Sequence, residues 1–296
     1  MSELAPASTR GQARMDALRR AAYRLRQSGL SLVGLVLVVM LLVVAAAGPW
    51  MAPYADQLSG AIDAAGRLQP PSAAHWMGTN ELGQDVFTLV LGGARISLFA
   101  GLAVVLLGAA VGTVVGAIAG YLGGWTDEVL MRFTDLALTL PGLILAMAVA
   151  AALGAGTGNM VLAIAITWWP GYARLVRGEV LARREDVYVL AARALGARPG
   201  RIMARHILPN IVSPVIVKMS LDVGFAVLTV ASLGFVGIGV RPPTPEWGQM
   251  LSSARGYLPD YWWTAIFPGA AIFVAVLGFN LLGDGLRDVL DPRSRR

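Results

Sequence analysis

The sequence predicts an all-α membrane protein with about six transmembrane helices, and three observations support this. The chain of 296 residues is 56% hydrophobic and only 14% charged, which leaves too little polar surface to cover a soluble globule of this size. Apolar runs that are long enough to cross a bilayer recur along it. Its basic residues also gather on one side of the resulting topology, as expected of a membrane protein.

The amino end of the chain, residues 1–29, is a polar tail with six arginines. The apolar run over residues 30–47 predicts the first span, and no small-residue cleavage site follows it. The arrangement is therefore typical of a signal anchor rather than a removed signal peptide. Residues 48–93 are mixed in polarity, and we expect them to form an extramembrane loop that ends in an interfacial helix.

The core membrane domain is predicted over residues 94–285. Its first span, residues 94–120, carries a glycine at every fourth position from Gly108 to Gly120. A row of bare backbone lets another helix pack at close range, and the lining of a cavity is the alternative. The remaining spans are predicted over residues 133–153, 159–172, 211–239 and 265–282.

Two of these spans contain breaks, one at Pro141 and Gly142 and the other between Trp168 and Gly171. Breaks persist at membrane depth only where protein or a water-filled path satisfies the freed backbone groups. Residues 286–296 form a polar carboxyl tail.

One long charged segment, residues 174–209, interrupts the apolar core and carries eight of the 24 basic residues. Glu185 and Asp186 suit the first turn of a helix and Arg193 suits the last, because these charges complement the helix dipole. We therefore expect a short helix over residues 184–195.

One face of this short helix is narrow and contains two alanines. At the spacing i, i+3, i+4, i+7 it comprises Tyr188, Ala191, Ala192 and Leu195. Small side chains let a partner's backbone approach, whereas a helix on a membrane surface usually shows bulky apolar side chains. We expect the face to dock in a protein groove, and the alternative is a solvated loop near anionic lipid. Gly196 can end the helix, and Pro209 closes the unit.

Six spans place both termini and residues 174–209 on the same side of the membrane. That side carries 19 of the 24 basic residues, so the positive-inside rule makes it cytoplasmic. The loop over residues 240–264 then lies on the opposite side, where its prolines and tryptophans suit an interface.

Charged residues inside the spans are few, and we single out Asp135, Lys218 and Asp222 as candidates for a translocation path. Lys218 and Asp222 are one turn apart and can neutralise each other, or they can face a polar path and touch a passing solute. An intramembrane Ser–His protease is excluded if this topology holds, because His75 and His206 lie outside the spans on opposite sides.

The sequence contains no cysteine and no His, Cys or carboxylate cluster within a span, so we expect no metal site. The only lysine, Lys218, does not follow a glycine, so the chain has no Walker A loop for ATP. The net charge is +6, but the sequence has no basic patch interleaved with aromatic residues, the pattern that favours nucleic-acid binding. We therefore expect no cofactor and no nucleic-acid partner.

The segment VLAARALGARPGRIMARHILP resembles the EAA motif of inner-membrane permease subunits of bacterial ABC importers. The residues at motif positions are Ala191, Ala192, Gly196, Leu208 and Pro209. Leu190 stands where the motif usually has glutamate, which puts a salt bridge from that position in doubt. Further segments resemble the peptide and nickel subfamily of these permeases. They are HWMGTNELGQDVF, GARISL, GYLGGWTDEVLMRFTD, WWPGYARLVRG, SLGFVGIGVRPPTPEWGQML and FNLLGDGLRDVLDP.

The resemblance implies a type I importer permease fold with cytoplasmic coupling helices, in a multi-pass protein of the bacterial inner membrane. The chain would not be an enzyme. It would form half of a translocation path that works by alternating access, beside a homologous second permease subunit. Two ATPase subunits would bind ATP and Mg²⁺, and a periplasmic or lipid-anchored binding protein would deliver the solute.

The same resemblance suggests roles for individual residues. The ATPase-coupling residues would be Tyr188, Ala191, Ala192, Leu195, Gly196, Leu208 and Pro209. The binding protein would contact Pro243, Glu246 and Trp247, for which an interfacial anchor is the alternative. Small peptides are the expected solute, and D-alanyl-D-alanine-type dipeptides, glutathione and a nickel chelate remain open. A stand-alone secondary transporter would need coupling-ion groups or inverted repeats, and the sequence shows neither.

Overall fold

The computed structural model describes residues 28–290, which form helices and loops without a named strand. The predicted tails therefore lie largely outside the described residues. The long helices are α2 (Gly29–Met51), α3 (Val86–Leu122), α4 (Gly124–Thr139), α5 (Gly142–Leu153), α6 (Thr157–Arg183), α9 (Leu208–Phe235) and α11 (Trp263–Leu290). The short elements are η1 (Ala55–Ser59), η2 (Ala64–Gly66), α7 (Val187–Ala194), α8 (Pro199–Ile202), η3 (Met203–Ile207), α10 (Trp247–Ala254) and η4 (Arg255–Tyr257).

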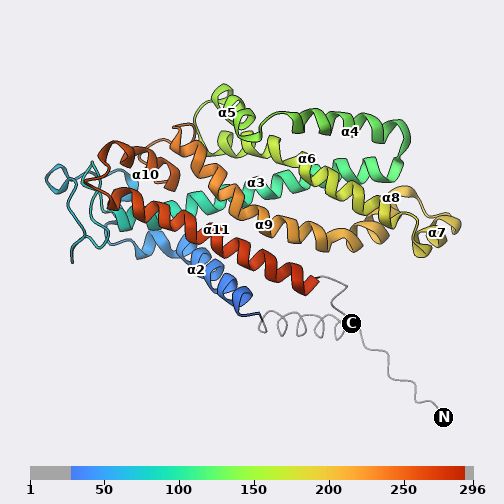
Figure 1. The fold of residues 1–296 in the computed structure, drawn as a ribbon, viewed down its shortest axis with the longest axis horizontal. Coiled ribbons are helices and arrows are strands. Elements are labelled where there is room, and N and C mark those ends of the chain that lie inside the picture. Colours follow the sequence, from blue (N-terminus) through green and yellow to red (C-terminus); the bar gives the residue numbers. More distant parts are fainter. Residues whose placement is uncertain (1–27, 291–296) are drawn as a thin grey trace, which may run out of the picture.

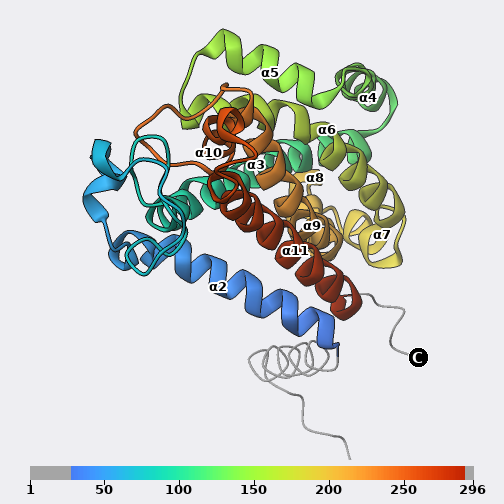
Figure 2. The same cartoon turned by 60° about the vertical axis from the view of Figure 1, so that its left-hand side comes forward.

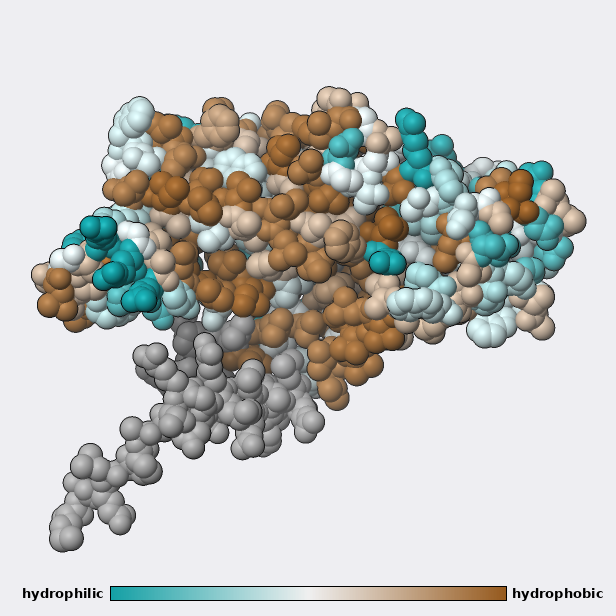
Figure 3. All heavy atoms as spheres, turned by 180° about the vertical axis from the view of Figure 1, so that it is seen from behind, coloured by the Kyte–Doolittle hydropathy of each residue, from teal (hydrophilic) through white to brown (hydrophobic). Residues whose placement is uncertain are grey.

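The molecule is elongated, and its two ends differ. Figure 1 shows α7 and α8 at one end, the α7 end, and α10 with residues 52–85 at the other, the loop end. The long helices α3, α6, α9 and α11 run between these ends, and α2 lies beside α11 (Figure 2). Hydrophobic side chains cover the middle of the face seen in Figure 3, whereas polar side chains gather toward the ends. This distribution suits a protein whose middle lies in a bilayer.

The centre of the fold is the crossing of α3 with α6, and the glycine row of α3 faces it. A Cβ atom on Gly108 would lie 3.1 Å from Trp168 of α6, and one on Gly120 would lie 3.0 Å from the carbonyl oxygen of Arg177. At Gly112 the same atom would collide with the carbonyl oxygen of Trp169. The prediction that the row packs against a helix is confirmed.

Four helices of the described chain are long and apolar enough to cross a membrane: α2, α3, the α8–α9 run and α11. A fifth candidate is α4 with α5, which meet at 90°. The predicted break at Pro141 and Gly142 is therefore confirmed, although the first helix of the pair begins at Gly124, earlier than the predicted residue 133. Pro141 lacks an amide hydrogen and restricts Leu140 to extended geometry, so the helix ends and a new one starts at Gly142.

Three further boundaries differ from the prediction. Helix α6 passes through Pro170 without a break and continues to Arg183, so the charged segment begins about ten residues later than expected. Helix α3 begins at Val86, so no separate interfacial helix precedes it. Helix α11 extends beyond residue 285, the predicted end of the core. That residues 159–172 of α6 form one of the six spans stays a prediction, since the second half of this helix is charged.

Candidate coupling, path and outer-loop sites

Helix α7 is held against the membrane core by one side and is exposed on the other. Val189 is fully buried and Ala192 is partly buried in an apolar cluster that includes Val180, Ile202 and Ile211. Asn210 Nδ2 also donates a hydrogen bond of 3.3 Å to the Tyr188 hydroxyl, which joins α7 to the start of α9.

The exposed side of α7 is apolar, and we call it the α7 face. Val187 is 83% exposed and Leu195, just after the helix, is 88% exposed. At the spacing i, i+3, i+4, i+7, i+8 this face comprises Val187, Leu190, Ala191, Ala194 and Leu195. Three residues of the predicted face, Tyr188, Ala191 and Leu195, are exposed as expected, but the prediction was wrong in two other respects. The helix starts later, and Ala192 faces inward because burial of the larger Val189 turns its side of the helix toward the core.

The predicted end of this unit is confirmed. Gly196 has a φ of 77°, in the left-handed region that favours glycine. Its amide donates to Arg193 and the Ala197 amide donates to Ala192, which closes the helix. Leu208 packs on the apolar cluster, and Pro209 lies exposed in the first turn of α9. The π-helical turn Met203–Ile207 between α8 and α9 was not predicted.

Arginines on the second half of α6 bind α4. Arg177 makes a bidentate ion pair with Asp127, at 2.5 and 2.7 Å. Arg174 Nη2 lies 2.7 Å from Asp135 Oδ1, and both side chains are about half exposed. Asp135, which the sequence suggested for the translocation path, is therefore part of the α4–α6 contact. The sequence placed these arginines in a loop, so their ion pairs with α4 were not predicted.

A further ion pair lies on α9, on the side of this helix that faces α6. Lys218 Nζ is 3.0 Å from Asp222 Oδ2, so the predicted one-turn pairing is confirmed. The lysine also lies 5.0 Å from the centre of the Tyr172 ring, a cation–π distance. Tyr172 is fully buried, and its hydroxyl has no hydrogen-bond partner among the described residues. Tyr172 was not among the residues predicted for the path, since nothing in its local sequence links it to Lys218.

The Lys218–Asp222 pair is incompletely covered by this chain. The Lys218 side chain is 34% exposed, and it lies beside Gly171 on α6. A charge pair that faces hydrocarbon is unfavourable, so such residues normally face a water-filled cavity or another protein. The pair therefore marks the α6–α9 surface as a candidate path surface.

At the loop end, two of the three predicted contact residues are buried. Glu246 is 0% exposed and Trp247 is 1% exposed, so the prediction that these side chains contact a binding protein is wrong. Glu246 caps α10 and accepts hydrogen bonds from Ser97 and from the amides of Gly248 and Gln249. Trp247 donates its indole hydrogen to the Val90 carbonyl oxygen at 3.0 Å. Both residues fasten α10 to α3, whereas Pro243 is exposed.

Glu246→Ala should destabilise the protein, since it leaves three buried donors without an acceptor. We expect the free energy of unfolding to fall by about 3 kcal/mol, measured as the unfolding midpoint of the purified chain. Arg241→Ala, at an exposed position in the same loop, is the control and should change little. An equal effect of the two variants would contradict the anchoring role.

The stability should also depend on pH through Glu246. Burial raises the pKa of this carboxyl above its ordinary value of 4.5, and its hydrogen-bond donors limit the rise. The folded state then binds a proton more tightly than the unfolded state, so stability falls as pH rises from 4.5 through the raised pKa. Glu246→Gln should remove this part of the pH dependence, and an unchanged slope would contradict the assignment.

Two family models match this chain. Residues 112–296 match the family described as binding-protein-dependent transport system inner membrane component. The chain belongs to this family. Residues 17–71 also match the N-terminal transmembrane domain of oligopeptide transport permease C. It is therefore a permease subunit of an ABC importer rather than an enzyme, and such a subunit works with ATPase and substrate-binding partners.

Several curated relatives resemble this permease over nearly its whole length. It is 45% identical over 275 residues to the probable D,D-dipeptide transport system permease protein DdpC of Escherichia coli K12, covering 93% of this chain and 91% of that protein. It is also 45% identical over 272 residues to the glutathione transport system permease protein GsiD of Escherichia coli O6:K15:H31 and of Shigella boydii, covering 92% of this chain and 89% of theirs. The permease is thus a multi-pass membrane protein of the same subfamily.

Proposed function

We propose that this permease forms half of the translocation path for small peptides across the bacterial inner membrane. The observation that carries this proposal is the Lys218–Asp222 pair, which puts both signs of charge on one half-covered intramembrane surface. A free peptide carries an ammonium and a carboxylate group, and each could replace one partner of the pair. The printed functions of the relatives, D,D-dipeptide and glutathione transport, support a peptide substrate. A nickel chelate is the second candidate of the subfamily.

The assembly that we propose contains a homologous second permease subunit, so that the α6–α9 surfaces of the two subunits enclose the path. Two ATPase subunits, which hold ATP and Mg²⁺, bind at the α7 end. A periplasmic or lipid-anchored binding protein docks at the loop end. In this orientation both termini are cytoplasmic, and the first half of α6 is the sixth span. The excess of basic residues near the α7 end supports it.

Transport would proceed by alternating access. Closure of the ATPases would move α7, and the packing of Val189 against Ile202 and Ile207 would make α8 and the following turn move with it. The π-helical turn Met203–Ile207 precedes α9 and offers a point where the helix can bend. Movement of α9 would then carry Lys218 and Asp222 relative to α6. The α7 face is the coupling surface in this mechanism.

The double variant Lys218→Met/Asp222→Leu tests the path. Lys218→Met alone leaves Asp222 without its partner, so we expect both the unfolding midpoint and peptide uptake to fall. The double variant should recover the midpoint, because an apolar pair can replace a buried ion pair. Its uptake should stay about tenfold or more below wild type, since the charge-assisted bonds to the peptide, about 1.5–3 kcal/mol each, are lost.

The measurement is ATP-dependent uptake of radiolabelled D-alanyl-D-alanine into vesicles that hold the whole importer. Ser220→Ala, on the same helix α9, is the matched control and should transport normally. Normal uptake by the double variant would show that the charge pair is only structural.

A further inference from the structure

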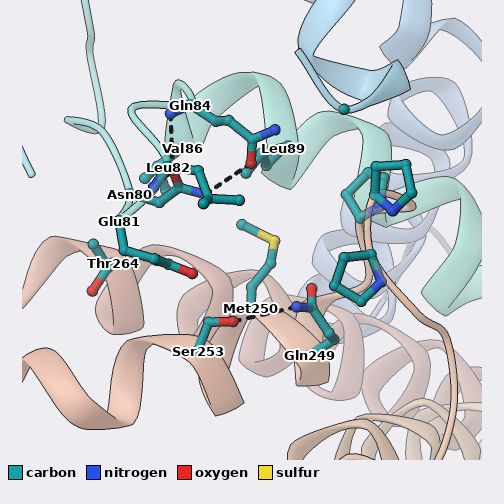
Figure 4. Close-up of a pocket in the computed structure, with 14 residues that line it drawn as sticks. Asn80, Glu81, Leu82, Gln84, Val86, Leu89, Gln249, Met250, Ser253 and Thr264 are labelled. Atoms are coloured by element: carbon teal, nitrogen blue, oxygen red, sulfur yellow. Dashed lines mark hydrogen bonds between the residues drawn. The ribbon is translucent and has the colours of Figure 1, made fainter. Parts of the chain in front are cut away.

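The loop end contains a cavity of about 340 Å³ next to the buried residues Glu246 and Trp247. Residues 52–85 form one wall and α10 the other, and Glu81 faces Gln249, Met250 and Ser253 across it (Figure 4). The rings of Pro242 and Pro243 form part of its rim. Its size is at the lower end of the range for ligand sites in proteins.

The charge of this cavity has one sign. Glu81 is its only charged lining residue, and no Arg, Lys or His side chain is among the described residues that line it. Glu81 has no ion-pair partner within the described chain. The nearby Arg67 donates to the main-chain oxygen of Glu81 instead of its carboxylate. Gln249, Ser253 and Asn80 add amide and hydroxyl groups, so the cavity suits a cation that donates hydrogen bonds.

Apart from Gln84 and Thr264, most of the remaining lining is apolar, which suits the stem of a long side chain. Leu82 and the proline rings lie near the rim, and the buried side chains of Val86, Leu89 and Met250 form an apolar floor. A cavity with one carboxylate and apolar walls fits the end of a long cationic side chain of a docked protein.

We propose that this cavity is the socket for a lysine or arginine side chain of the substrate-binding protein. The aliphatic stem of that side chain would lie against Leu82, Met250 and the proline rings, and its charged head would reach the Glu81 carboxylate. The contact lies beside the buried Glu246 and Trp247 rather than on them. The proposal rests on the proposed position of the binding protein at the loop end. It does not depend on which solute is imported.

Cysteine labelling tests the socket directly, because the chain contains no cysteine of its own. Ser253→Cys places a thiol in the lining, and Ala73→Cys places one on the exposed outer loop as the control. The probes are the cationic reagent MTSET and the anionic reagent MTSES, applied to the assembled importer. The ratio of the MTSET labelling rate to the MTSES labelling rate should be about tenfold higher for the Ser253→Cys variant than for the Ala73→Cys variant, because the Glu81 charge attracts one reagent and repels the other. Adding Glu81→Gln to the Ser253→Cys variant should bring this ratio close to that of the Ala73→Cys variant.

The second arm of the experiment identifies the occupant. The substrate-binding protein that copurifies with the importer should protect the thiol at position 253 from MTSET. Glu81→Gln should raise the concentration of binding protein for half-protection about tenfold, because the socket then lacks its charge.

Three outcomes would overturn the proposal. The first two are the absence of a charge preference at position 253 and protection that does not depend on Glu81. The third is protection by free D-alanyl-D-alanine, which would indicate a solute site. If the binding protein protects the thiol but the importer transports a solute other than a peptide, the socket proposal is supported and only the proposal of peptide transport is refuted.

Discussion

Ala191→Arg should abolish ATP-driven import while the permease stays folded and inserted in the membrane. Ala191 lies on the exposed α7 face, outside the apolar cluster that holds α7 in place. An arginine there can remain in water in the isolated chain, so stability should change by less than about 0.5 kcal/mol. When the ATPase docks, the same charge must enter an apolar contact, which costs several kcal/mol. We therefore expect uptake and stimulated ATP hydrolysis to fall by more than about tenfold.

Two other alanines sharpen this test. Ala192→Arg should instead lower the unfolding midpoint, because Ala192 packs inward with Val189. Ala73→Arg, an exposed alanine at the loop end, adds the same charge and should leave ATP hydrolysis unchanged. Uptake assays in vesicles and unfolding of the purified chain separate these effects. Normal transport by Ala191→Arg would refute the coupling role of the α7 face.

Gly112→Ala should prevent the permease from folding stably. A single methyl group there would collide with the Trp169 carbonyl oxygen and with Tyr172 of α6. Backbone atoms cannot rotate away as a flexible side chain can, so α3 and α6 must separate. We expect a loss of about 3 kcal/mol or more, visible as a lower unfolding midpoint and less monodisperse protein.

Gly178→Ala is the matched control for this effect. Gly178 is also helical, but a Cβ atom added there meets nothing within 4 Å. Alanine favours a helix more than glycine does by about 1 kcal/mol, so this variant should be neutral or slightly more stable. Equal destabilisation by the two variants would contradict close packing of the glycine row.

The features that could be predicted from the sequence depend on local spacing. A four-residue period places Gly108 and Gly120 on one face of α3 wherever that helix packs, and a one-turn separation lets Lys218 reach Asp222. The apolar runs likewise predict α2 and α11. Gly196 ends α7 because glycine tolerates the left-handed conformation that a helix terminus needs.

The features that could not be predicted depend on distant partners. The charges of Arg174 and Arg177 suggested that these residues belong to a loop. Carboxylates of α4 neutralise both charges, and helix α6 continues through them. Likewise the resemblance suggested an exposed contact at Glu246, and carboxylates are rarely buried. Its capping of α10 and its bond to Ser97, 149 residues away in the sequence, decide otherwise. The rotation of α7 follows from packing of Val189 against α9 and its neighbours.

Cross-linking from the α7 face tests the central claim most directly. The Ala191→Cys variant of this cysteine-free chain should cross-link to an ATPase subunit of the assembled importer, and the Ala192→Cys variant should not. In intact cells, an impermeant thiol reagent added from outside should leave the thiol at position 191 unlabelled. Labelling of that thiol from outside, or the absence of any cross-link to an ATPase, would contradict the account.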